Sequence, residues 1–152
     1  MSEFDVKEKR FESDIESALC TTGGYVKGDP RVFNRELALY TETLLSFIKQ
    51  SQPKKWERYT KLYGDSCEQQ FLKRFNDSVE HDGVLSILRH GFKDRGITFR
   101  VVYWKPETSM NETARAQYES NIFHCTRQLH YSFSINNSVD IVLFLNGIPV
   151  VS

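Results

Sequence analysis

Hydrophobic side chains recur at helical spacing through the first part of the chain. In residues 6–91 apolar positions return every three or four residues, which places them on one face of an α-helix. The first helix is expected over residues 6–19, with an apolar face made of Phe11, Ile15, Ala18 and Leu19. Asn34 is expected to cap a second helix that Pro53 ends. Further helices are predicted over residues 54–63, 68–79 and 84–90.

The pattern changes to alternation after Gly91. Residues 97–104, ITFRVVYW, predict a strand, and residues 111–120 predict a short polar helix or a loop. Residues 122–134 alternate as well, with an expected buried face of Phe123, Cys125, Leu129 and Tyr131. The opposite face, expected to be wet and hydrogen-bonding, carries His124, Thr126, Gln128 and His130.

The last segment, VDIVLFLNGIPVVS, predicts a hairpin. Residues 139–145 are apolar on both faces, as in a central strand, and Asn146-Gly147 is the strongest short signal for a hairpin turn. Helices followed by a mixed sheet predict an α/β fold. The 152 residues suit one domain, with a helical part over about 6–91 and a sheet part over about 97–152.

Composition excludes several classes of protein. Twenty basic residues balance twenty acidic ones, so a nucleic-acid surface would have to be a local patch. Cys20, Cys67 and Cys125 lie far apart, without zinc spacing, and Gly23, Gly24 and Gly28 do not form a phosphate-binding loop. A charged amino terminus and the lack of a long apolar run predict a cytoplasmic protein.

Carboxylates at two places are candidates for a metal site. Asp140 lies at the head of the apolar run, where a carboxylate must be paired, hydrogen-bonded or bound to metal. Glu8, Glu12 and Glu16 share one face of the first helix, so they repel one another unless a cation lies nearby. An Asp bonded to turn amides and a solvated acidic face are the alternatives that these patterns leave open.

Basic and polar residues form weaker candidates for binding DNA. Lys54, Arg58 and Lys61 share one face of a predicted helix and could follow a phosphate backbone. Gln128, between Arg127 and the nearby His130, could contact phosphate or orient a water. Both sets could equally be ordinary solvated surface. His124 and Cys125 are neighbours in a strand and point to opposite faces, which argues against a catalytic pair.

Six segments follow one another in a specific order. They are FESDIESAL with GGY, FIKQSQPKKW, GVLSILRHG, VVYWKP, RQLHYS and VDIVLFLNGIPVVS. In this order and spacing they resemble the N-terminal region of the restriction (R) subunit of type I restriction-modification enzymes. The resemblance covers the chain from about Phe11 to Ser152. Each motif is loose alone, and DIVLFLNGIPV after RQLHYS is the most telling part.

The resemblance implies a nuclease of the PD-(D/E)xK class, like the RecB nucleases, with a restriction-endonuclease-like mixed sheet flanked by helices. In such enzymes an Asp on one strand and a Glu-x-Lys on the next hold Mg²⁺ and stabilise charge at the scissile phosphate. Asp140 matches the family's Asp. Glu12 is the candidate for a first-helix glutamate that assists at the metal, and Glu8 and Glu16 stay open.

The chain also departs from the family pattern. The Glu-x-Lys of such relatives would lie just beyond Ser152, so we expect a fold truncated at its C-terminus. We therefore expect little cleavage by this fragment alone, whether it is a shortened piece of a longer protein or the product of a truncated gene. An exposed last strand could also pair two copies as a dimer.

The intact subunit would cleave double-stranded DNA with Mg²⁺, driven by an ATP-dependent motor and assembled with methylation and specificity subunits. The alternative is a docking module that binds DNA or subunits without chemistry and carries a decayed nuclease fold.

Overall fold

The computed structural model describes residues 2–152 and has a mixed α/β architecture, which confirms the predicted class. The described residues form two compact units. The first contains the described residues 2–40 and Ile122–Ser152, and the second contains Thr41–Asn121. A single domain over residues 1–152 stays a prediction.

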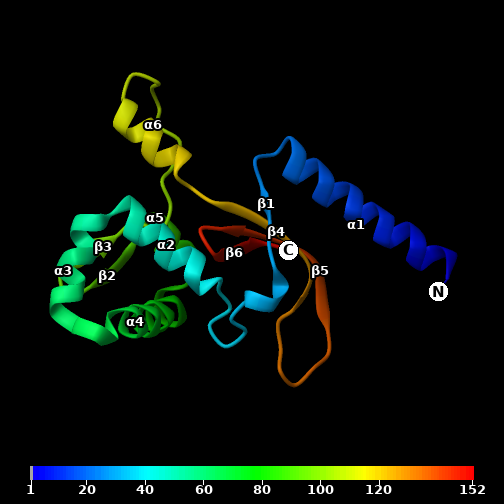
Figure 1. Cartoon of the computed structure of the whole chain (residues 1–152), viewed down its shortest axis with the longest axis horizontal. Coiled ribbons are helices and arrows are strands. Elements are labelled where there is room, and N and C mark those ends of the chain that lie inside the picture. Colours follow the sequence, from blue (N-terminus) through cyan, green and yellow to red (C-terminus); the bar gives the residue numbers. More distant parts are fainter. Residues whose placement is uncertain (1) are drawn as a thin grey trace. The chain divides into compact units, whose positions relative to one another are not determined.

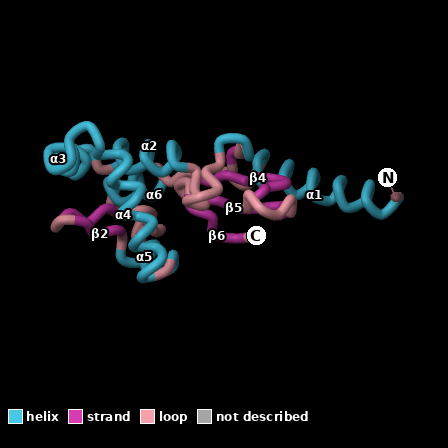
Figure 2. The backbone as a smooth tube through the Cα atoms, turned by 90° about the horizontal axis from the view of Figure 1, so that it is seen from below, coloured by secondary structure: helices cyan, strands magenta, loops and turns pink. Residues whose placement is uncertain are grey.

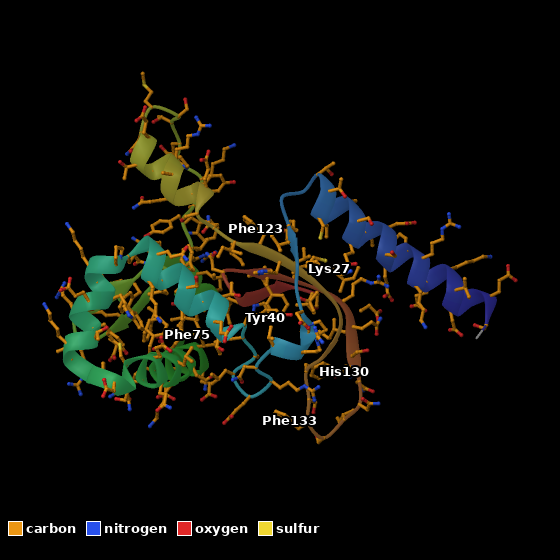
Figure 3. All side chains as sticks on the ribbon, in the orientation of Figure 1. Lys27, Tyr40, Phe75, Phe123, His130 and Phe133 are labelled. Atoms are coloured by element: carbon orange, nitrogen blue, oxygen red, sulfur yellow. The ribbon has the colours of Figure 1, made fainter. Side chains whose placement is uncertain are left out.

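The first unit combines one long helix with a mixed sheet (Figure 1). Its elements are α1 (Glu3–Thr21), β1 (Val26–Lys27), the 3₁₀ turn η1 (Pro30–Val32), β4 (Phe123–His130), β5 (Ser138–Leu145) and β6 (Ile148–Val151). The strand order is β1-β4-β5-β6; β1 runs parallel to β4, and the other pairs are antiparallel. A core cluster on one face of the sheet consists of Phe33, Tyr40, Leu129, Val142 and Phe144. Figure 3 labels Tyr40 over the middle of the sheet.

The predicted hairpin at Asn146-Gly147 is confirmed. Both residues have a positive φ, 52° and 85°, as the tightest antiparallel turns require. Asn146 is fully buried, and its side-chain oxygen accepts a hydrogen bond from the backbone nitrogen of Ile122 at 2.7 Å. Strand β6 is an edge of the sheet, where Val151 is 56% exposed. Pairing of two copies through this edge stays a prediction.

The second unit is mainly helical, as Figure 2 shows by its cyan tubes. Its elements are α2 (Thr41–Ser51), α3 (Pro53–Tyr63), the 3₁₀ turn η2 (Gly64–Ser66), α4 (Cys67–Asp82), α5 (Val84–His90), β2 (Phe92–Asp94), β3 (Ile97–Phe99) and α6 (Glu112–Glu119). Its core is aromatic: Phe71 is fully buried and packs edge-on against Tyr59, Phe92 and Phe99. The helices predicted over 54–63, 68–79 and 84–90 are confirmed as α3, α4 and α5. The predicted first and last residues of these helices agree with the observed ones to within three positions.

Two predicted elements are wrong in their extent. Asn34 does not start a helix. Its backbone N–H and C=O both bond to Leu39, at 2.9 and 3.2 Å, which closes residues 35–38 into a turn, and α2 begins only at Thr41. The strand predicted over 97–104 ends at Phe99. There the Gln52 side chain bonds both the N–H and the C=O of Arg100, at 2.7 and 2.8 Å, in place of a neighbouring strand.

The predicted wet face of residues 122–134 is wrong for His124 and Thr126, whereas Gln128 is exposed and hydrogen-bonded as predicted. Strand β4 ends at His130, and Thr126 is fully buried with its hydroxyl 2.8 Å from that of Tyr40. The sheet is therefore covered on the side that carries His124 and Thr126. In residues 2–152, no helix has the length and apolar character needed to cross a bilayer.

Candidate functional site

The acidic face of α1 packs toward the sheet instead of toward solvent. Ser2 caps the helix through a reciprocal pair of hydrogen bonds with Asp5. Glu12 and Glu16, one turn apart, are only 6% and 7% exposed, whereas Glu8 is exposed. Of the three glutamates, only Glu8 therefore fits the alternative of a solvated acidic face. Phe11, from the predicted apolar face, is 66% exposed.

Arg127 of β4 supplies the cation that these two glutamates need. Its Nη2 lies 3.4 Å from Oε2 of Glu12, and its Nη1 lies 3.7 Å from Oε1 of Glu16. Lys27 of β1 adds a second positive charge, 3.3 Å from Oε1 of Glu16 (Figure 3 labels Lys27). Two strands thus hold Glu16 by opposite charges, and Glu12 has a single ionic partner in the described residues.

A change of face in the β4–β5 hairpin brings the remaining candidates to the same side as α1. Gln128 has a positive φ of 51°, which is uncommon for a residue other than glycine. Thr126 contacts the core, and so does Leu129, although strict alternation would put them on opposite faces. Val139 on β5 likewise packs against the cluster that contains Val142.

Gln128 joins the two strands to the helix. Its Nε2 donates to Oε2 of Glu12 at 3.0 Å and to Oδ1 of Asp140 at 3.4 Å. Its Oε1 accepts a hydrogen bond from the Ser138 hydroxyl at 2.9 Å. The structure therefore brings together Glu12, Gln128 and Asp140, three residues selected from the sequence, across more than 110 positions of the chain.

The cluster lines an open groove of the first unit. Its walls are formed by Asp5, Glu8, Lys9, Glu12, Gln128 and Asp140. An adjoining groove between the helix and β5 is largely apolar, and its lining includes Phe11, Ile15, Val139 and Ile141. Asp140 is exposed and borders both grooves, so it is accessible to an ion or a phosphate.

The carboxylates and the amide oxygen suit a hard divalent cation. Mg²⁺ prefers oxygen ligands and commonly uses one or two carboxylates and several waters. Glu12 and Asp140 share one amide donor, so an oxygen of each lies within 3.4 Å of the same nitrogen, Nε2 of Gln128. Within residues 2–152 no three His, Cys, Asp or Glu side chains are grouped closely enough to hold a metal by themselves. The fit is thus to two carboxylates completed by neutral ligands.

Lys54, Arg58 and Lys61 are placed in the second unit. All three are exposed on α3, and Lys61 pairs with Glu57 one turn away at 3.4 Å. They form a basic helical face, as the sequence predicts. Their role in binding DNA stays a prediction.

His124 and Cys125 point to different environments, as expected for neighbours in a strand. The His124 ring lies 5.9 Å from that of Tyr40, and burial lowers the pKa of His124. Burial, followed by the nearby Cys20 and Glu16, raises the pKa of the Cys125 thiol. A neutral thiol without a histidine partner is not a nucleophilic pair.

A family model described as "Type I restriction enzyme R protein N terminus" matches residues 46–152. The chain belongs to this family. No curated protein and no solved structure matches the chain. The type I restriction enzyme match includes Gln128 and Asp140 but not α1, so Glu12 joins the cluster from outside the matched segment.

The sequence analysis missed residues that surround Glu12, Gln128 and Asp140 in this restriction-enzyme family member. Arg127 appeared only as a neighbour of Gln128, and the polar strand FHCTRQLH gives no sequence signal that Arg127 pairs with two acids of the first helix. Lys9 lies one turn before Glu12 and lines the same groove, and its helical spacing could have identified it. Ser138 carries no sequence signal for its bond to Gln128.

Proposed function

We propose that this chain is part of the Mg²⁺-dependent DNA endonuclease region of a type I restriction enzyme R subunit. The observation that carries the proposal is the meeting of Glu12 and Asp140 at the Gln128 side-chain amide, beside an open groove. Family membership supports the restriction enzyme, and the paired acids support a metal-dependent reaction. The fold would then be of the restriction-endonuclease-like PD-(D/E)xK class.

In this proposal each residue has a defined task. Glu12 and Asp140 hold Mg²⁺, which when bound polarises the scissile phosphate and lowers the pKa of a coordinated water. Lys9, at the rim of the groove, attracts the DNA phosphate. Arg127 orients Glu12 toward the sheet through its ion pair. Duplex DNA approaches from the groove side. The exposed lysines and arginine of α3, in the second unit, are a separate candidate for contacting DNA phosphate.

The larger assembly follows from the family. In the intact enzyme the nuclease region would act with an ATP-driven motor and with methylation and specificity subunits, and the specificity subunit would select the DNA sequence. The described residues supply two carboxylates to the site, so we expect this chain alone to cleave DNA weakly or not at all.

Cation binding tests the proposal directly. Mn²⁺, a spectroscopic substitute for Mg²⁺, is titrated onto the chain and free Mn²⁺ is followed by electron paramagnetic resonance. Asp140→Asn should lower the affinity by at least about tenfold, because a carboxylate ligand is lost. Asp14→Asn, which removes an exposed acid elsewhere on α1, should leave it unchanged. Equal affinity in both variants would contradict the metal site.

A docking module is the second candidate, and one observation favours it. Glu12 already has a cationic partner in Arg127, so its charge is balanced without a metal. This candidate predicts that duplex DNA or a subunit binds while Mn²⁺ does not, and that Asp140→Asn changes neither. The same titration, together with a DNA-binding assay, separates the two functions.

A further inference from the structure

The Gln128 amide bonds both of the acids that would hold a cation. Both of its N–H bonds are directed at carboxylate oxygens, those of Glu12 at 3.0 Å and Asp140 at 3.4 Å. This orientation is dictated by chemistry, because ionised carboxylates only accept hydrogen bonds. The amide oxygen consequently turns the other way, toward the Ser138 hydroxyl at 2.9 Å.

A divalent ion between the acids is incompatible with this orientation. An amide nitrogen with two hydrogens is no ligand for a hard cation, whereas an amide oxygen is one. Rotation of the terminal amide by half a turn exchanges the two atoms without moving the rest of the side chain, and this torsion is soft. The oxygen then points to the ion and the nitrogen points to Ser138.

Ser138 makes this exchange possible without loss of a hydrogen bond. A hydroxyl both donates and accepts, so Ser138 can donate to the amide oxygen in one state and accept from the amide nitrogen in the other. The rotation concerns only the last torsion of the side chain, so it does not require the backbone of Gln128, which has a positive φ, to move.

We propose that Gln128 is a reversible third oxygen ligand, whose amide holds Glu12 and Asp140 together in the absence of metal and flips when a divalent cation binds. The proposal rests on the metal site described above and adds a residue to it. It also accounts for a site in which no third acidic, histidine or cysteine ligand is present among residues 2–152.

If Gln128 were a competitor of the cation and not a ligand, removal of its amide would change the cation affinity in the opposite direction. If the amide only competes with the cation for the two acids, its removal would strengthen cation binding. If the amide supplies a ligand, its removal would weaken binding. Gln128→Met keeps the length of the side chain and removes both polar atoms. Gln128→Asn keeps the amide on a shorter arm, and Asn tolerates a positive φ, so this variant should fold even where Met does not.

The Mn²⁺ affinity of the whole chain is measured for the wild type, for both Gln128 variants and for Asp140→Asn. Gln117→Met, on the exposed surface of α6, is the control. Far-ultraviolet circular dichroism confirms folding. We expect both Gln128 variants to bind about tenfold more weakly and Gln117→Met to bind like wild type. In ¹⁵N spectra the side-chain amide of Gln128, identified by its loss in Gln128→Met, should shift with Mg²⁺.

The outcomes separate the two proposals. Unchanged or tighter binding by the Gln128 variants, with weaker binding by Asp140→Asn, overturns the flip and leaves the metal site standing. Wild-type binding by Asp140→Asn, or no binding by any protein, overturns the metal site and the flip with it.

Discussion

Nε2 of Gln128 on β4 lies 3.4 Å from Oδ1 of Asp140 on the neighbouring strand β5. At this point of the hairpin both strands change the face that they present to the core. The flanking pairs, Arg127 with Ile141 and Leu129 with Val139, keep the register on either side. Because Leu129 and Val139 turn into the core, the polar pair between them turns toward α1. The candidate site therefore depends on the change of face at Gln128 as well as on its side chains.

Arg127 should be essential for the packing of α1 on the sheet. Arg127→Gln leaves Glu12 and Glu16 buried with a weaker partner, and we expect the free energy of unfolding to fall by about 2–3 kcal/mol. Arg115→Gln, which breaks an exposed pair with Glu119, should change it by less than about 0.5 kcal/mol. Urea unfolding followed by circular dichroism measures both, and equal effects would refute the structural role of Arg127.

Local features of the fold could be predicted from the sequence, but its long-range pairings could not. Gly and Pro positions mark the ends of most helices, and Asn146-Gly147 marks the last hairpin. Strand β2 was missed because three residues give too short an alternation, and the positive φ of Arg95 before Gly96 is no sequence signal. The Gln52 bond to Arg100 joins positions 48 residues apart.

The site was predictable in its members and not in its arrangement. Asp140 is marked by its place before an apolar run, and Glu12 by a helical stripe of acids. Their distance apart depends on the face change at Gln128, which no alternation pattern encodes. Burial of Glu12 and Glu16 was unexpected for the same reason, since their cation comes from a strand more than a hundred residues away.

Protonation of His124 should destabilise the first unit. Burial lowers the folded-state pKa of His124, and its buried Nδ1 has no hydrogen-bond partner in the described residues, so the unfolded chain binds the proton more readily. The contribution to stability is present above the unfolded pKa of about 6.5 and is lost as pH falls through the lower folded value. His124→Gln should reduce the loss of stability between about pH 7 and pH 5.

Circular dichroism is the suitable probe for this effect, because Trp56 and Trp104 both lie in the second unit. His90→Gln, at an exposed position, is the control and should keep the wild-type dependence on pH. A wild-type pH profile in His124→Gln would exclude the buried histidine as its source.

The aromatic core should dominate the stability of the second unit. Phe71 is fully buried and contacts Trp56 as well as the other aromatic rings, so Phe71→Ala should lower the free energy of unfolding by about 3–5 kcal/mol. Leu62→Ala, at a half-exposed position of α3, should lower it by less than about 1 kcal/mol. Tryptophan fluorescence during denaturant unfolding reports on this core directly, and similar losses in both variants would speak against it.

Self-association through β6 is open to a matched test. Val151→Lys places a charge on the sheet edge and should prevent pairing of two edges. Val6→Lys puts the same charge at a similarly exposed position of α1 and should have no effect. Sedimentation velocity over a range of concentrations should show a dimer that only Val151→Lys abolishes; a monomer throughout would rule out edge pairing.

The basic face of α3 makes a prediction that depends on salt. Arg58 is the best single residue to test, because it is exposed and Lys61 on the same face is already paired with Glu57. If Arg58 neutralises a DNA phosphate, Arg58→Gln should weaken duplex binding by a similar factor whatever the DNA sequence. It should also reduce the slope of log affinity against log salt concentration by about one. Fluorescence anisotropy with a labelled duplex at several salt concentrations measures the slope. Lys105→Gln removes an exposed charge from the same unit and should leave the slope unchanged, so an equal loss in both variants would indicate a diffuse charge effect instead of a contact at α3.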